Sequence, residues 1–109
     1  IQGWSPAVLP TDATPMQVHG DIPISAAGTY KVTFTYTRGR DALRIAAVQL
    51  FDGDRLVVED RHAGSTGHRH SNNNYTLEVP ANVRNPKLFV IFNMGSKRDS
   101  AGNITIEKL

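Results

Sequence analysis

Residues 29–37 read Thr-Tyr-Lys-Val-Thr-Phe-Thr-Tyr-Thr, and this stretch decides the fold more clearly than any other. Tyr30, Val32, Phe34 and Tyr36 fall on one side of an extended chain, while threonine and lysine fall on the other. Strict alternation in aromatic and β-branched residues is typical of a strand buried on one face only. Antiparallel sheets produce this pattern, whereas parallel strands are usually apolar on both faces. We therefore expect an antiparallel, all-β protein.

Further strand patterns recur at short intervals. In residues 42–51 the apolar positions change phase at Ala46-Ala47, which predicts a β-bulge. Asp52-Gly53 is a strong hairpin signal that leads into residues 55–60. The other predicted strands are 16–24, 74–79, 87–93 and 103–109, with 87–93 as a central strand covered on both faces.

Short strands at this spacing fit an antiparallel β-sandwich of seven to eight strands, galactose-binding-like or jelly-roll-like. Its core is expected to contain Tyr30, Val32, Phe34, Tyr36, Leu43, Ile45, Val48, Leu50, Leu88, Val90, Phe92, Ile104 and Ile106.

The composition is that of one ordinary globular domain. A chain of 109 residues can build one core, so residues 1–109 are expected to form a single domain. The net charge is only +2 and basic residues alternate with acidic ones, which argues against a nucleic-acid partner. No apolar run reaches membrane-spanning length, and the absence of cysteine excludes disulfides and thiolate metal sites. Because the chain begins at Ile1, we expect a processed piece whose export signal could have been removed.

Residues 60–79, DRHAGSTGHRHSNNNYTLEV, hold the densest group of polar side chains. We expect a long loop over residues 61–74, and loops on rigid β scaffolds often carry binding groups. Amide side chains beside an aromatic ring suit a sugar, although asparagines also occupy turns and the tyrosine could simply pack. The candidate ligand contacts are His62, His68, His70, Asn72 and Asn73, with Tyr75 as an aromatic platform.

The histidines have two other interpretations. Asp60, His62, His68 and His70 offer ligands for zinc, copper or nickel, but their spacing is loose, so we predict no metal site. The interpretation that we favour pairs Asp60 with His62 through a hydrogen bond at the start of the loop. Turn-forming residues would complete this structural loop: Gly64, Thr66 and Gly67.

No complete catalytic set is present in the sequence. Ser65, His62 and Asp60 lie within one short segment, whereas a hydrolytic triad draws its members from separate segments. The acidic residues are scattered on turns, so no carboxylate pair for glycoside hydrolysis can be assigned. Two clusters offer oxygen ligands for calcium without matching a calcium loop, and no cofactor is predicted. These clusters are Asp52-Gly53-Asp54 and Asp99-Ser100 with Asn103.

Several motifs in order resemble a known type of domain. They are Trp4-x-Pro6, GTYKVTFTY at 28–36, VQLFDGDRLVVEDRHAGSTG at 48–67, NNNYTLEVP at 72–80 and DSAGNITIEKL at 99–109. Together they resemble the β-sandwich accessory domains of secreted bacterial glycoside hydrolases, most closely the non-catalytic C-terminal domains of β-hexosaminidase-like enzymes. The resemblance extends over nearly the whole chain.

This resemblance implies a galactose-binding-like sandwich in a secreted, periplasmic or cell-surface protein. It implies an accessory domain that is not itself an enzyme and that binds carbohydrate weakly, for which the 61–74 loop is the expected site. The alternative is a purely structural domain that packs against a catalytic domain of the same polypeptide. A second location for a ligand is the turn around Arg98, Asp99 and Ser100.

Overall fold

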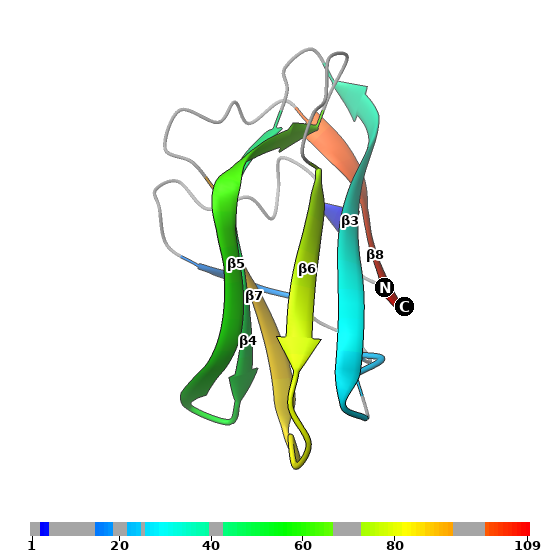
Figure 1. Cartoon of the computed structure of the whole chain (residues 1–109). Helices are drawn as coiled ribbons and strands as arrows, with labels where there is room; N and C mark the ends of the chain where they lie inside the picture. Colours follow the sequence, from blue (N-terminus) through cyan, green and yellow to red (C-terminus); the bar gives the residue numbers. More distant parts are fainter. Residues whose placement is uncertain are drawn as a thin grey trace.

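The computed structural model describes residues 3–4, 15–18, 22–24, 26–39, 43–66, 73–92 and 100–109. All regular structure in these residues is β-strand, arranged as two four-stranded antiparallel sheets that face each other (Figure 1). The predicted antiparallel β-sandwich is therefore confirmed. The strands are β1 (Gly3–Trp4), β2 (Met16–Gln17), β3 (Gly28–Gly39), β4 (Leu43–Asp52), β5 (Arg55–Thr66), β6 (Asn74–Val79), β7 (Pro86–Phe92) and β8 (Ser100–Lys108).

The strand order is that of a jelly roll. Sheet A has the order β1-β8-β3-β6, and sheet B has the order β2-β7-β4-β5. Each strand of the first half pairs with one of the second half in reverse order: β1 with β8, β2 with β7, β3 with β6 and β4 with β5. A long hairpin rolled into two sheets gives this order. One consequence is that β5 and β6 end different sheets yet lie side by side along one edge of the sandwich (Figure 1).

The core lies between the two sheets and follows the alternation read from the sequence. Most residues that we expected in it are buried: Tyr30, Val32, Phe34, Ile45, Val48, Leu50, Leu88, Val90, Phe92 and Ile104. Tyr36 and Ile106 are only half-buried, and the side chain of Leu43 lies outside the described ones. The core also contains apolar residues that we did not predict, namely Met16, Val18, Ile24, Tyr75, Leu77 and Val79.

Two local predictions concern β4 and the turn that follows it. The bulge at Ala46-Ala47 is confirmed, because the register of β4 shifts between Ile45 and Ala47 against both of its neighbours. The hairpin to β5 is also present, but its central residues are Gly53 and Asp54, one position later than expected. Gly53 has a φ of +63°, as the first central residue of a type II′ turn requires.

The largest difference from the sequence prediction lies in β5. This strand continues to Thr66, so the first residues of the expected 61–74 loop are part of sheet B. The inward-facing positions His62 and Gly64 carry no apolar side chain, which hides the two-residue period in the sequence. Another expectation needs correction as well: β7 is central, but its outward residues Phe89 and Ile91 are half-buried rather than fully covered.

Candidate functional site

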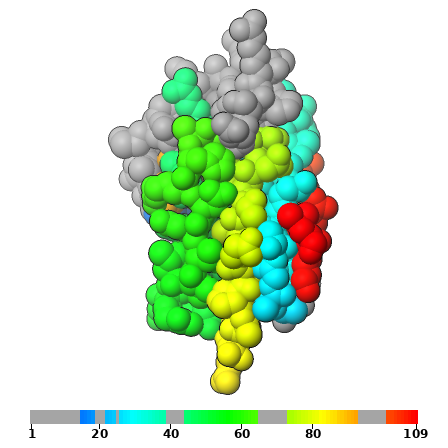
Figure 2. Space-filling view, in the orientation of Figure 1, coloured from blue at the N-terminus to red at the C-terminus, as the bar shows by residue number. Residues whose placement is uncertain are grey.

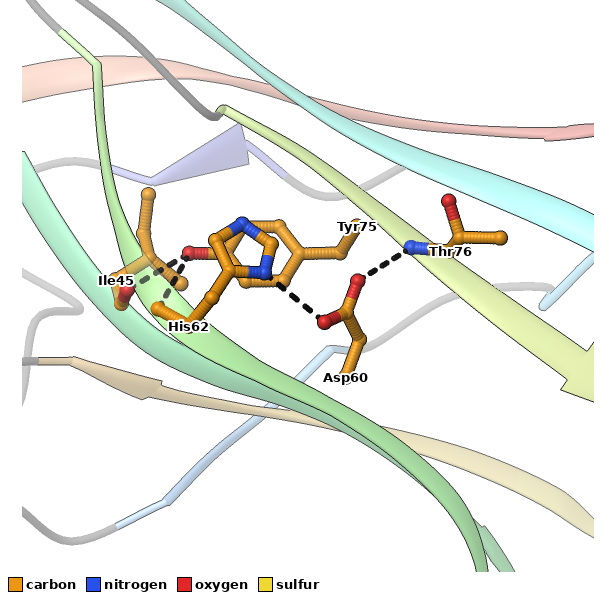
Figure 3. Close-up of polar contacts among 5 residues, drawn as sticks. All are labelled: Ile45, Asp60, His62, Tyr75 and Thr76. Carbon is orange, nitrogen blue, oxygen red and sulfur yellow. Dashed lines mark hydrogen bonds and ion pairs between the residues drawn. The ribbon is translucent and has the colours of Figure 1, made fainter.

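Two features could carry a function, and the first is the seam where β5 meets β6. Asp60 connects the two strands: its Oδ1 lies 2.9 Å from Nδ1 of His62, and its Oδ2 accepts the backbone N–H of Thr76 at 2.8 Å (Figure 3). The Asp60–His62 hydrogen bond that we predicted is present. Because Thr76 belongs to an edge strand, the carboxylate takes the place of a neighbouring strand's carbonyl. Figure 2 shows the surfaces of β5 and β6 in contact along this seam.

Tyr75 forms the inner part of the seam. Its ring stacks on the imidazole of His62, with the centroids 4.1 Å apart and the planes 11° from parallel. Its hydroxyl donates to the carbonyl of Ile45 at 2.7 Å, and Phe34 packs edge-on against the ring at 5.6 Å. Tyr75 is completely buried, so the expectation of an exposed platform for a sugar is wrong. The reason is that alternate side chains of β6 face the core, and Tyr75 points to the same side as the buried Leu77 and Val79.

The electrostatics of the seam favour a neutral phenol. Burial is the main cause that raises the pKa of Tyr75 well above its ordinary value, and the negative charge of Asp60 acts in the same direction. Near neutral pH the hydroxyl therefore remains a hydrogen-bond donor to Ile45. This arrangement joins strands of both sheets, and its polar atoms are used by the fold.

The other candidate contacts of the loop are partly accounted for. Asn73 donates from Nδ2 to the carbonyl of Phe34 at 2.8 Å, and its own carbonyl accepts the N–H of Phe34 at 3.1 Å. Asn73 therefore links β3 to the start of β6 instead of forming a turn. Gly64 and Thr66, expected in turns, are paired with Ile45 and Leu43 inside sheet B.

The remaining candidates fall outside the described residues, and the predictions about them stay predictions. These are His68, His70, Asn72 and Gly67, together with Arg98 and Asp99 of the second location. Within the described part of the chain, no three side chains of the His, Cys, Asp or Glu type gather as metal ligands. Asp52, a candidate calcium ligand, accepts the backbone N–H of Asn85 at 2.9 Å and so supports the hairpin.

The second feature is a chemical contrast between the two outer faces of the sandwich. On sheet A the outward rows formed by β3, β6 and β8 are polar, with Thr33 between Asn74 and Thr105, and Lys31 between Thr76 and Glu107. On sheet B one row holds Glu59, Gln49 and Phe89, and the next holds Leu56, Phe51 and Lys87. Side chains directly opposite each other in a sheet share a face and make contact. Sheet B therefore presents aromatic groups among polar ones.

A shallow hollow of about 230 Å³ lies on this face of sheet B. Phe51 and Phe89 form its apolar part, with their ring centroids 5.2 Å apart and their planes 71° from parallel. Both rings are only half-buried. The polar side chains at the hollow are Gln49, Asp54 and Lys87, and Pro15 and Gly53 complete the lining.

This hollow was not predicted from the sequence, although the sequence contains a signal for it. Gln49 and Phe51 have the opposite phase to Val48 and Leu50, so after the bulge they must point outward. In the run Leu88 to Phe92, Phe89 likewise has the opposite phase to its buried neighbours. We interpreted that run as apolar on two covered faces, and register across three strands is needed to bring these residues together.

Comparison with known proteins adds no relative. No protein-family model matches the sequence, and no curated protein matches it. In the part of the chain that the structure describes, no helix is long and apolar enough to cross a membrane. Among the described residues, the seam and the hollow are the features from which we infer a function.

Proposed function

We propose that this domain is a non-catalytic accessory domain of an exported, carbohydrate-active protein, and that it binds glycan weakly in the hollow of sheet B. The observation that carries the proposal is the half-exposed pair Phe51–Phe89, set in a hollow beside an amide, a carboxylate and an ammonium group. Sites for small ligands combine an apolar lining with a few placed polar groups in this way.

The hollow supports this function better than the seam does. At the seam His62 is bonded to Asp60, Asn73 is bonded to Phe34, and Tyr75 is buried. A ligand that competed for these groups would have to break hydrogen bonds within β5 and between β3 and the start of β6, and would have to reach into the core for Tyr75. The polar groups of the hollow instead lie at an outer surface, where a ligand can reach them without disturbing the core.

The size of the hollow indicates weak binding. Pockets that enclose drug-sized ligands have volumes of roughly 300–1,000 Å³, and this hollow has about 230 Å³. It can therefore contact a small part of a glycan, and we expect dissociation constants near the millimolar range, equivalent to about −4 kcal/mol. Weak modules of this kind act by keeping a linked partner near its substrate.

A glycan array probed with the purified domain tests the proposal. We expect retention of at least one class of glycan, equally in calcium and in a chelator, because Asp54 is the one carboxylate among the described lining residues and calcium takes six to eight oxygen ligands. Phe89→Ala should abolish the retention by removing half of the aromatic pair. Thr105→Ala, on the opposite face, is the matched control and should bind as the wild type does.

The competing function makes a different prediction in the same experiment. If the face of sheet B packs against a catalytic domain of the same polypeptide, no glycan will be retained at millimolar concentration. In that case the proposal is wrong and the domain is structural. A signal that survives Phe89→Ala unchanged would show that glycan binds elsewhere.

A further inference from the structure

Gln49 is held in one orientation at the hollow. Its Nε2 donates to Oε2 of Glu59 at 2.8 Å, and Glu59 stands directly opposite it in the sheet. An ionised carboxylate can only accept hydrogen bonds, so the amide nitrogen must face Glu59 and the amide oxygen must face away. Nη2 of Arg61 lies 3.6 Å from the same Oε2 and forms an ion pair with the carboxylate.

The ionised state of Glu59 is favoured by these same contacts. The hydrogen bond from Gln49 is the main reason that the pKa of Glu59 lies below its ordinary value, and the charge of Arg61 acts in the same direction. The carboxylate is therefore available to orient Gln49 throughout the neutral and mildly acidic range.

An amide held in this way presents a defined pair of groups to a ligand. The side chain of Gln49 keeps its carbonyl oxygen as an acceptor and a second N–H as a donor. Two adjacent hydroxyl groups match that pair, because each hydroxyl both donates and accepts. Phe89 is the next residue of the same row across β7, so the amide and an aromatic ring lie side by side.

The charges at the hollow favour a neutral ligand. Asp54 and Lys87 carry opposite charges, and the negative charge of Glu59 faces that of Arg61. Among the side chains that the structure describes there, neither sign of charge prevails to attract an anionic or a cationic sugar.

We propose that the hollow binds one neutral pyranose ring, whose apolar face lies on one ring of the Phe51–Phe89 pair and whose two adjacent hydroxyls bond to Gln49, with Glu59 as the positioning residue for that amide. This inference rests on the proposed function and adds to it the class of sugar and the residue that recognises it. The hollow is too small for several sugar units, which is why a single ring is assigned.

Nuclear magnetic resonance titration with methyl β-D-glucopyranoside and with the corresponding methyl glucuronoside tests the inference. The neutral glycoside should shift the side-chain amide of Gln49 and the backbone amides of Phe51 and Phe89. The glucuronoside, which carries a carboxylate, should bind no more tightly. Gln49→Ala should weaken binding about tenfold, since two hydrogen bonds to the sugar are lost. Thr105→Ala, outside the hollow, should bind as the wild type does.

The pH dependence of glycoside affinity tests the positioning role of Glu59 separately. Wild-type affinity should stay constant from neutral pH to below the ordinary pKa of a glutamate, near 4.5, and fall only when Glu59 is protonated. In Glu59→Gln the affinity should be lower at neutral pH and the fall in acid should be absent. Asp54 supplies the carboxylate that lines the hollow itself, and Asp54→Asn should keep the acid fall if Glu59 is its cause.

The outcomes separate this inference from the proposed function. The inference would be overturned, while glycan binding stands, by either of two results. One is that the chemical-shift changes caused by the glycoside are centred near Asn73 and Thr76, and the other is that Gln49→Ala binds with wild-type affinity. Tighter binding of the glucuronoside would overturn the assignment to a neutral sugar. If neither glycoside binds and the array is also silent, both proposals are wrong.

Discussion

At the scale of single residues, Tyr75 shows how a polar group can belong to the core. The ring fills space between Phe34 and His62, while the hydroxyl reaches the carbonyl of Ile45 at the bulge of β4. Because a bulge disrupts the ladder locally, a carbonyl there benefits from a side-chain partner. The tyrosine thus satisfies a polar backbone group and packs at the same position.

This dual role predicts a loss of stability at alkaline pH. The pKa of Tyr75 is higher in the folded state than in the unfolded state, where it is about 10. The stability that the protonated hydroxyl contributes is therefore fully present below about pH 10 and is lost as the pH rises towards the folded-state pKa. Between pH 10 and 12 the wild type should lose about 1.4 kcal/mol of unfolding free energy per pH unit more than Tyr75→Phe. Urea unfolding at several pH values measures this difference.

The control for this prediction is a destabilised variant that keeps the tyrosine. Val79→Ala removes a buried side chain from the same strand, and its alkaline slope should be parallel to that of the wild type. If Tyr75→Phe loses stability with pH as steeply as the wild type does, the phenol is not the group that titrates.

At the scale of elements, the seam solves a problem that the jelly-roll order creates. β5 and β6 are both edge strands, and exposed edges can pair with other chains. Inward-pointing charged residues are one means of protecting an edge. Asp60 occupies such a position on β5. Its carboxylate accepts the backbone N–H of Thr76 on the unpaired edge of β6, which closes this side of the sandwich (Figure 3).

Removal of the carboxylate should therefore destabilise the domain. Asp60→Ala deletes the bonds to His62 and to the Thr76 N–H, and hydrogen bonds to a charged group contribute about 1.5–3 kcal/mol. Glu107→Ala is the matched control, because it removes a carboxylate from an exposed ion pair with Lys31, for which about 0.2–1 kcal/mol is expected. Equal losses in the two variants, measured by urea unfolding, would contradict the role assigned to Asp60.

At the scale of the whole molecule, the outer faces of the two sheets differ in chemistry and, as we propose, in role. Sheet A carries threonine, asparagine and charged residues outward, as a solvent-exposed face should. Sheet B carries Phe51 and Phe89 outward, where they contribute nothing to the core. A core that is complete without these rings leaves them available for a ligand.

The contribution of this core to stability can be tested at Phe34. This ring is fully buried in sheet A and packs against Tyr75 from the neighbouring strand, so Phe34→Ala should lower the unfolding free energy by about 3–5 kcal/mol. Thr35→Ala, on the exposed face of the same strand, should cost less than about 1 kcal/mol. Chemical unfolding of both variants measures the contrast, and a small effect of Phe34→Ala would mean that the core is not centred there.

Much of the fold follows from local patterns in the sequence. The alternation in β3 predicted its buried face, the phase change in β4 predicted the bulge, and Asp52-Gly53 predicted the hairpin within one residue. These features depend on the geometry of a single strand or turn, so neighbouring residues contain the information. The Asp60–His62 bond was also predictable, since the two residues are close in the chain.

The sites depended on the tertiary structure because they join residues that are distant in sequence. Tyr75 stands next to asparagines in the chain, and only the pairing of β6 with β3 buries it. Gln49 meets Glu59 and Phe89 only because sheet B brings three strands into one register. The sequence by itself therefore determined the class of fold and its local turns, since side-chain alternation is a property of one strand. Which polar residues are used by the seam, and which face a ligand, was decided by strand pairing, since register sets every neighbour across a sheet.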